Sequence, residues 1–434
     1  MVKNIFAVGL DDFHLAQLQG LQGADNYRFH PFLSYHEIKR VKHFPVKELL
    51  DYAGWVLQEF DTTVDAVIGF WDFPVSTSLP IIQKELGQVG PSLVSVLKCE
   101  HKYWSRLLQK EVVPELVPPF QKINPFQKDA VSRCSLDFPF WLKPVKSVLS
   151  HLGFLIRSPG EFEASLEIIR KNIGRYAEPF NLIMSKADLP ETIRDVDGYY
   201  CIGEGLISQG SQCTLEGYVY QGSVSIYGVI DSLRDEEHRS TFTRYQYPSN
   251  LPSAVQQRMI EATQKVMTHV GYDNAPFNIE FYWDEDHGSI HLLEINTRIS
   301  KSHCPLFKMV DGEYHHKVLI DLALGQRPDF PYRKGQFKVA AKFMLRHFQD
   351  GRVKAVPGKE DIRQVKEKFP GTVVTLHVCE GMFLSDLFDQ DSYSYEIAVL
   401  FMGADNYGEL SANYETALAM LPFTIENNED RKKI

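Results

Sequence analysis

Two short apolar runs near the start of the chain predict strands of a parallel sheet. The run from Ile5 to Gly9 ends in glycine, and the run from Val64 to Phe70 precedes a helical pattern over Ser76–Leu86. Strands that alternate with helices favour a parallel sheet whose ligands approach the carboxyl ends of the strands. Leu-Asp-Asp follows Gly9, so the glycine-rich dinucleotide fingerprint is missing. Residues 1–97 are therefore predicted to form an α/β unit.

The rest of the chain alternates between helical and strand patterns without repeats. The segment from Pro114 to Pro125 predicts a loop or an extended connection, because proline disfavours a helix. The expected helical and amphipathic stretches are Glu100–Lys110, Pro159–Arg175 and Ser253–Val270, and the expected strands lie in Phe138–Val145, Val196–Ile207, Cys213–Asp231 and Gly271–Ile299. Strands and helices alternate again from Phe337 to Glu426, and the charged tail after it is expected to fray. The predicted fold class is α/β (α+β).

The most informative segment, residues 277–298, predicts a β-hairpin. Its turn chemistry, Asp284-Glu-Asp-His-Gly288, lies between two apolar runs. A five-residue loop over 285–289 places Asp284 opposite Ile290, and therefore Glu280 opposite Glu294. Directly opposite side chains share one face of a sheet, with Cβ atoms about 4.5–5.5 Å apart.

The hairpin also predicts a cluster of oxygen ligands. Asn278 and Tyr282 lie on the face of Glu280, and Asn296 points with Glu294. Two like charges directly opposite are destabilising unless something offsets them. A divalent cation would do so, and an oxygen-only set of this kind suits Mg²⁺. The alternative is a solvent-exposed hairpin whose acidic residues bind no metal, because a shift of one residue in register would separate Glu280 from Glu294.

Composition and charge exclude several other classes of protein. The 434 residues carry a formal net charge of -10 and no Lys/Arg block, which gives no electrostatic footprint for nucleic acid. No apolar run approaches the roughly 20 residues of a membrane span, and the N-terminal residues do not resemble a signal peptide. The six scattered cysteines form no CxxC pair, which predicts reduced thiols and a cytoplasmic protein.

The hairpin closely resembles the metal-binding signature of ATP-grasp ligases, in the branch shared by biotin carboxylase and the L-amino-acid ligases. The segments that carry the resemblance are Asn-Ile-Glu280-Phe, Leu293-Glu-Ile-Asn-Thr-Arg298, Glu100-His-Lys-Tyr-Trp-Ser-Arg-Leu-Leu, Trp141-Leu-Lys-Pro and Ile202-Gly-Glu-Gly-Leu-Ile207. The resemblance implies an ATP-grasp fold in three parts. These are a Rossmann-like preATP domain over 1–97, a nucleotide-binding region over 98–330 with its lid at about 134–204, and a C-terminal subdomain over 331–434.

The resemblance also implies roles for individual residues. Lys102 and Lys143 are expected to contact the ATP phosphates, since phosphoryl transfer needs positive charge near the developing oxyanions. Glu204 and Leu206 match the adenine hinge, and Glu216 aligns near the nucleotide only if a one-residue offset after Ser208 is accepted. The alternatives without a binding role are that Lys102 and Lys143 are ordinary surface lysines and that the hinge residues form a strand end with a glycine-rich turn.

The remaining carried-over residues lie in and after the hairpin. Glu280, Glu294 and Asn296 are expected to hold Mg²⁺, with Mn²⁺ as an alternative metal, and Arg298 is expected to face the reacting acyl phosphate. The residues expected to shape the acceptor pocket include Ser300 and His303, although a lone histidine is more often structural.

One departure from the family affects the lid. Many relatives carry a flexible glycine-rich loop after the second lysine, which binds phosphates through backbone N–H groups. This chain has Lys146-Ser-Val-Leu-Ser-His-Leu-Gly153, with one glycine. Ser147, Ser150 and His151 are candidates for the polar contacts, or the lid is less mobile.

The resemblance implies a carboxylate–amine ligase that forms an amide through an acyl phosphate and releases ADP and phosphate. The expected partners are a small carboxylate and an amine, such as amino acids. Nucleic acid and membranes are not expected as partners. Relatives are often dimers, so a homodimer is a candidate assembly. Two alternatives remain open: an ATP-grasp enzyme with a non-amine acceptor, or an ATP-binding regulatory protein without turnover.

Overall fold

The structure is a computed structural model that describes residues 2–38, 44–148, 151–207, 210–238, 241–387, 390 and 394–427. The chain divides into two compact units. The first contains residues 1–227, 252–301 and 316–329, and the second contains 228–251, 302–315 and 330–434. The three-part division expected from the sequence stays a prediction. No helix in the described ranges combines the length and the apolar character of a membrane span.

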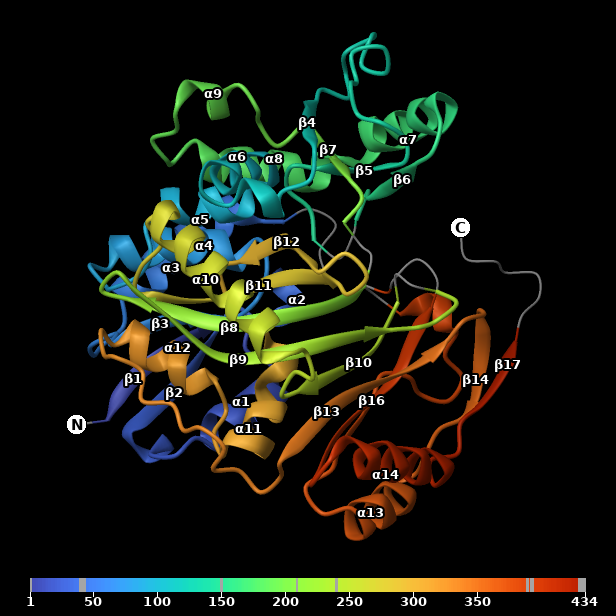
Figure 1. Cartoon of the computed structure of the whole chain (residues 1–434). Coiled ribbons are helices and arrows are strands. Elements are labelled where there is room, and N and C mark those ends of the chain that lie inside the picture. The colour runs from blue at the N-terminus through green and yellow to red at the C-terminus, as the bar shows by residue number, and fades with distance from the viewer. Residues whose placement is uncertain are drawn as a thin grey trace. The chain divides into compact units, whose positions relative to one another are not determined.

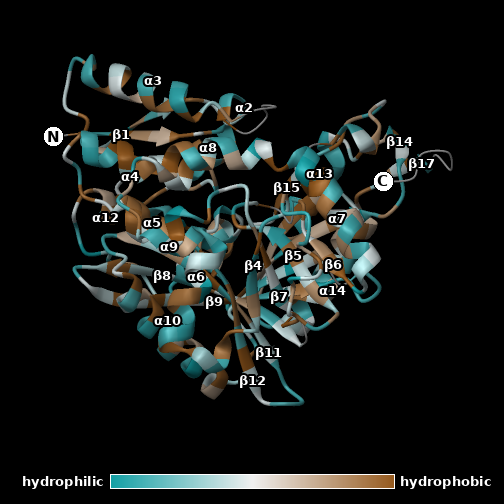
Figure 2. Cartoon of the chain, turned by 90° about the horizontal axis from the view of Figure 1, so that it is seen from above, coloured by the Kyte–Doolittle hydropathy of each residue, from teal (hydrophilic) through white to brown (hydrophobic). Residues whose placement is uncertain are grey.

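The first unit begins with a small parallel sheet (Figure 1). Its strand order is β2-β1-β3, and both strand pairs are parallel, as predicted. The elements of this part are β1 (Lys3–Val8), α1 (Asp12–Gln19), η1 (Ala24–Asn26), β2 (Tyr27–Phe32), α2 (Tyr35–Ile38), α3 (Val46–Gln58), β3 (Ala66–Gly69), α4 (Val75–Glu85) and α5 (Leu93–Glu100). Apolar positions about four residues apart explain the helices: α3 buries Leu49, Ala53 and Leu57, and shows brown and teal residues in Figure 2.

Gly9, directly after β1, is a position that requires glycine. Its backbone has φ +73°, which L side chains rarely adopt, and an added Cβ would lie 2.9 Å from the Trp71 indole. That indole donates from Nε1 to the Gly9 carbonyl at 2.8 Å. The contact joins the carboxyl ends of β1 and β3, where the parallel sheet meets the site described below.

A four-stranded antiparallel sheet follows, with strand order β4-β7-β5-β6. Its apolar core includes Phe140, Leu142 and Phe162, all fully buried. The elements here are α6 (Lys102–Val112), η2 (Pro114–Leu116), β4 (Phe120–Ile123), β5 (Phe140–Pro144), β6 (Phe154–Ile156), α7 (Pro159–Asn172), α8 (Gly174–Met184), α9 (Glu191–Arg194) and β7 (Cys201–Gly205). The predicted strand over 196–207 is thus shorter, because residues 196–200 form a turn.

The first unit also contains three strands of a larger antiparallel sheet, in the order β12-β11-β8. Helix α10 packs against β11, and Figure 1 shows it beside the hairpin of β11 and β12. The elements are β8 (Ser211–Tyr220), α10 (Ser253–Val270), β11 (Ala275–Asp284), β12 (Ser289–Asn296) and α12 (His316–Ala323). Strand β9 (Ser223–Arg234) begins in the first unit and ends in the second.

The second unit continues from β9 with strands in the order β10-β13-β16-β15. Its core combines Phe343, Leu400 and Met402 from the sheet with Leu410 from α14. The elements are β10 (Phe242–Tyr247), η3 (Lys301–His303), α11 (Cys304–Asp311), β13 (Val339–His347), β14 (Gly351–Ala355), α13 (Lys359–Lys368), β15 (Val373–Leu376), η4 (Leu384–Asp386), β16 (Tyr395–Ala404), α14 (Tyr407–Ala419) and β17 (Thr424–Asn427). All six cysteines are free thiols.

Candidate functional site

The first predicted phosphate lysine, Lys102, begins helix α6 and points toward the turn after β5. His101 caps the helix, since its Nδ1 accepts from the Trp104 N–H at 3.2 Å. The Lys102 Nζ donates to the Ser147 carbonyl at 3.1 Å, and its backbone N–H donates to the Val145 carbonyl at 2.9 Å. The start of α6 is therefore fixed against the segment that follows the second lysine.

The surroundings of Lys102 mix positive and negative charge. Burial lowers the pKa of Lys102 from its ordinary 10.5 to about 8; Glu294 and Glu204 favour the charged form, while Lys143 and Lys146 oppose it. The ammonium groups of Lys143 and Lys146 and the hairpin carboxylate of Glu294 thus interact electrostatically with Lys102. Such a concentration of ammonium groups in an acidic protein is suited to an anion.

The second predicted lysine, Lys143, forms an ion pair with Glu204, which is predicted to lie in the adenine hinge. Lys143 lies opposite Ile202, so Glu204 is its diagonal neighbour on the same face of the sheet. Its Nζ lies 2.5 Å from Glu204 Oε2, and Arg106 Nε lies 2.5 Å from Glu204 Oε1. Burial would raise the pKa of Glu204, but Arg106 and Lys143 lower it to about 2. The carboxylate is therefore the shared anion of two cations.

The hairpin of β11 and β12 places Glu280 opposite Glu294, as predicted, but with a different loop length and a bulge. The predicted five-residue loop is wrong: Asp284 pairs with Ser289, so the loop is residues 285–288. A β-bulge then restores the register, because Phe281 pairs with Leu292 and Glu280 pairs with Glu294. Leu293 is the extra residue. Without the bulge Glu280 would face Leu293, and Glu294 would turn to the other face of the strand.

The face that carries the two carboxylates is lined with amides. Asn296 Nδ2 donates to Asn278 Oδ1 at 3.0 Å and approaches Glu280 Oε1 at 3.4 Å. Gln212 Nε2, from β8, donates to Glu280 Oε2 at 2.8 Å. No group of three or more His, Cys, Asp or Glu side chains that could hold a metal occurs in the described part of the chain. The oxygen set is instead two carboxylates with neighbouring amides, and such hard oxygen ligands fit Mg²⁺.

Arg298, two residues after β12, is held by Asp72 from the end of β3. Its Nε donates to Asp72 Oδ1 at 2.6 Å, and Nη1 donates to the Ile299 carbonyl at 3.2 Å. Burial would lower the pKa of Arg298, but Asp72, Glu216 and Glu280 hold it above its usual value. The guanidinium therefore stays charged.

Glu100 ties the turn after β5 to the end of the hairpin. Its carboxylate accepts from Lys146 Nζ and from Thr297 Oγ1, and all three side chains are buried. Thr297 lies between Asn296 and Arg298 in the sequence. This buried contact joins the lysine-bearing segment to the strand that carries the carboxylates.

The other predicted site residues differ in burial and do not all lie in the same compact unit. Glu216 is fully buried on β8 and accepts from the Ser300 N–H at 3.2 Å, which brings two predicted residues together. Leu206, beyond β7, is 38 % exposed. His303 is buried in the second unit, where its ring packs edge-on to Tyr245 at 5.2 Å between centroids.

The predicted lid residues also differ in their surroundings. Ser147 is buried and uses its carbonyl for Lys102. His151 packs against the Tyr176 ring at 5.2 Å, and burial together with Arg175 lowers its pKa. Ser150 lies outside the described residues.

Sequence reasoning missed Arg106, Gln212 and Asp72. Arg106 lies four residues after Lys102, one helical turn along the same face of α6, and this spacing was an available signal. Gln212 is paired with Tyr282 across β8 and β11, a register that the sequence does not specify. Asp72 follows β3 at the carboxyl edge of the parallel sheet, where ligand-contacting residues are expected.

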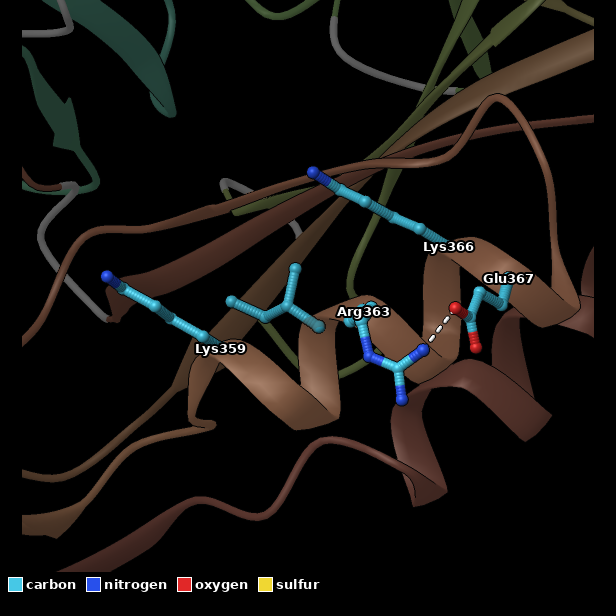
Figure 3. A pocket seen from close by; sticks show the side chains of 5 residues that line it. Lys359, Arg363, Lys366 and Glu367 are labelled. Carbon is cyan, nitrogen blue, oxygen red and sulfur yellow. Dashed lines mark hydrogen bonds and ion pairs between the residues drawn. The ribbon is translucent and has the colours of Figure 1, made fainter.

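A surface hollow elsewhere carries no comparable arrangement. It has a volume of about 460 Å³ and lies along α13 in the second unit. Figure 3 shows Lys359 and Lys366 extending away from Arg363, whose guanidinium pairs with Glu367. Because its central arginine also pairs with Glu360, we assign no ligand to this surface.

Comparisons with known proteins agree with the geometry. The family model described as "ATP-grasp domain" matches residues 136–304. No curated protein matches the sequence.

Solved structures give a likeness over almost the whole chain. An L-amino acid ligase from Bacillus licheniformis has a TM-score of 0.71 at 15% identity, and the alignment covers 98% of this chain and 99% of that one. A phosphoribosylglycinamide synthetase from Anaerococcus prevotii has a TM-score of 0.66 at 13% identity, covering 98% and 100%. The biotin carboxylase domain of 2-oxoglutarate carboxylase from Hydrogenobacter thermophilus has a TM-score of 0.64 at 14% identity, covering 98% and 92%. The chain therefore has the ATP-grasp fold that its sequence resembles, and residues 136–304 match the model of an ATP-grasp domain.

Proposed function

We propose that the protein is an ATP-dependent carboxylate–amine ligase that forms an amide through an acyl phosphate. A carboxylate oxygen attacks the γ-phosphorus of ATP and ADP leaves. The amine then attacks the acyl carbon, phosphate leaves and the nitrogen loses a proton. The observation that carries the proposal is the buried contact of Glu100 with Lys146 and Thr297, which joins the lysine-bearing segment to the hairpin with the opposed carboxylates.

In this proposal the lysines and the hinge bind the nucleotide. Lys102 and Lys143 would hold the phosphate oxygens, because ammonium groups stabilise the charge that develops there. The hinge around Glu204 and Leu206 would receive the adenine, with Glu216 near the nucleotide. Glu204 would orient the Lys143 ammonium group, since the two groups are 2.5 Å apart.

Glu280, Glu294 and Asn296 are the proposed holders of Mg²⁺, or of Mn²⁺. Bound there, the ion would neutralise phosphate charge. The fit rests on the carboxylates, which face one another across the bulge although like charges repel. Gln212 and Asn296 fix the orientation of Glu280 through its two oxygens. The Glu280 carboxylate is thus preorganised for a cation.

Arg298 is the proposed catalytic residue. Its guanidinium is held in place by Asp72 and stays charged. Placed beside the acyl group, it would stabilise the oxyanion that forms when the amine attacks, and it would orient the carboxylate in the first step. Ser300 and His303 are the proposed contributors to the acceptor pocket.

The substrate classes are proposed from similarity. The Bacillus licheniformis structure is titled as an L-amino acid ligase, which supports amino acids as the carboxylate and the amine. The Hydrogenobacter thermophilus domain was described as a dimer with MgADP and bicarbonate, which supports magnesium and keeps a non-amine acceptor as the second candidate. The homodimer and the cytoplasmic location stay predictions.

The test is nucleotide turnover with a panel of carboxylates and amines, with products identified by mass, beside Glu294→Ala. ADP and phosphate released only when both partners are present, and lost in the variant, would support the proposal. AMP and pyrophosphate would reject the acyl-phosphate route. ADP formation that needs bicarbonate and no amine would favour the second candidate.

A further inference from the structure

The register of the carboxylate hairpin depends on a bulge in the edge strand of the sheet. Strand β12 is the outer strand in the order β12-β11-β8, so its outward carbonyls have no strand beside them within that sheet. The bulge residue, Leu293, immediately precedes Glu294. Bulges disturb the ladder locally and need other partners for the backbone groups that they free.

Arg106 supplies these partners. Its Nη1 donates to the Leu292 carbonyl at 2.7 Å, and its Nη2 donates to the Leu293 carbonyl at 3.0 Å. Successive carbonyls of a regular strand point to opposite sides, because the strand has a period of two. One guanidinium reaches both carbonyls here because the bulge turns them to the same side. The planar fork of arginine therefore matches the bulged backbone and not the regular one.

The same side chain reaches the nucleotide hinge. Arg106 Nε donates to Glu204 Oε1 at 2.5 Å, and Nη1 also donates to Gln109 Oε1 at 2.6 Å. The Arg106 side chain is 2 % exposed. A guanidinium buried so fully and bonded at all three nitrogens has one available orientation, which fixes β7, α6 and β12 to one another.

We infer that Arg106 is a positioning residue for the proposed metal site. It stabilises the bulge at Leu293, and the bulge sets Glu294 opposite Glu280. A regular strand in its place would turn Glu294 to the other face and leave one carboxylate. The inference rests on the proposed function for the identity of the metal and nucleotide, but the link between Arg106 and the bulge does not.

The Arg106→Lys variant separates this role from simple charge compensation. Lysine keeps a positive charge for Glu204 but lacks the planar fork that reaches two carbonyls. We expect Mn²⁺ binding, measured by electron paramagnetic resonance with the non-hydrolysable analogue AMP-PNP, to weaken at least about tenfold, as for other residues that orient metal ligands. Arg170→Lys is the matched control, since Arg170 also donates to a main-chain carbonyl, that of Pro125, outside the site. Wild-type Mn²⁺ affinity in Arg106→Lys would overturn the inference.

Two further measurements keep the test independent of folding and of the proposed function. Hydrogen exchange in the absence of metal should be faster in residues 289–296 of Arg106→Lys, and unchanged in Arg170→Lys. Equal exchange in β12 would overturn the link to the bulge, whereas faster exchange in a protein whose wild type binds no Mn²⁺ would refute only the proposed metal site.

Deletion of Leu293 removes the bulge while keeping Glu294 opposite Glu280. In that background Arg106→Lys should change Mn²⁺ affinity less than about threefold, and an undiminished effect would contradict the proposed mechanism.

Discussion

Replacing Glu204 by glutamine should destabilise the protein, because two cations lose their shared anion. Arg106 and Lys143 each lie 2.5 Å from one oxygen of Glu204, whose side chain is 5 % exposed. Burial would raise the pKa of Glu204, but the two cations lower it from 4.5 to about 2. At about 1.4 kcal/mol for each pKa unit, the charged carboxylate contributes about 3 kcal/mol to the free energy of unfolding at pH 7.

The assay is urea unfolding of Glu204→Gln, wild type and Glu163→Gln at pH 7. Glu163 is an exposed residue of α7, so its variant should stay within about 0.5 kcal/mol of wild type. The folded pKa lies below the unfolded one, so this stabilisation is present above about pH 4.5 and is lost as the pH falls toward 2. The gap between Glu204→Gln and wild type should narrow in the same range. A Glu204→Gln variant as stable as Glu163→Gln at pH 7 would refute the reasoning.

Three further predictions concern charge and pH. The Lys102 pKa of about 8 predicts that the KM for ATP rises between pH 7 and 9 in wild type but not in Lys102→Arg, and parallel pH profiles would contradict it. Glu280→Gln should lose most of the rise in melting temperature that Mg²⁺ with AMP-PNP gives wild type, because it removes one of the two proposed carboxylate ligands; a retained rise would count against the metal site. Burial lowers the pKa of His101 to about 4, so the free energy of unfolding should fall as the pH drops below 6.5, by about 2 kcal/mol at pH 5. Urea unfolding of His101→Gln should lack this pH-dependent component, and an unchanged dependence of the unfolding free energy on pH would contradict the prediction.

The hairpin illustrates both what the sequence could predict and what it could not. The assumed five-residue loop placed Glu280 opposite Glu294, and the structure has this pair. The loop, however, is one residue shorter than predicted, and the bulge at Leu293 compensates for the difference. The bulge could not be read from local pattern, because the arginine that binds it lies 186 residues before Leu292.

The same distinction holds for the rest of the fold and the site. Local patterns were sufficient for β1 and β3, which contain continuous apolar runs, and for α10, whose apolar positions follow the helical period. Motif resemblance located Lys143 and Glu204, and the structure joins them as an ion pair. Partners that come from other elements, such as Asp72 for Arg298, depend on the tertiary arrangement, and the local pattern does not specify which residue they pair with.

The ligase proposal is tested most directly by following the carboxylate oxygen during turnover. The enzyme would be supplied with Mg²⁺, ATP and a pool of the common amino acids whose carboxylates carry ¹⁸O, with the products analysed by mass spectrometry. The account predicts ADP, an amide and phosphate that contains one ¹⁸O atom, because the carboxylate oxygen leaves with the phosphoryl group. Unlabelled phosphate, AMP with pyrophosphate, or no turnover of any amino acid would contradict it.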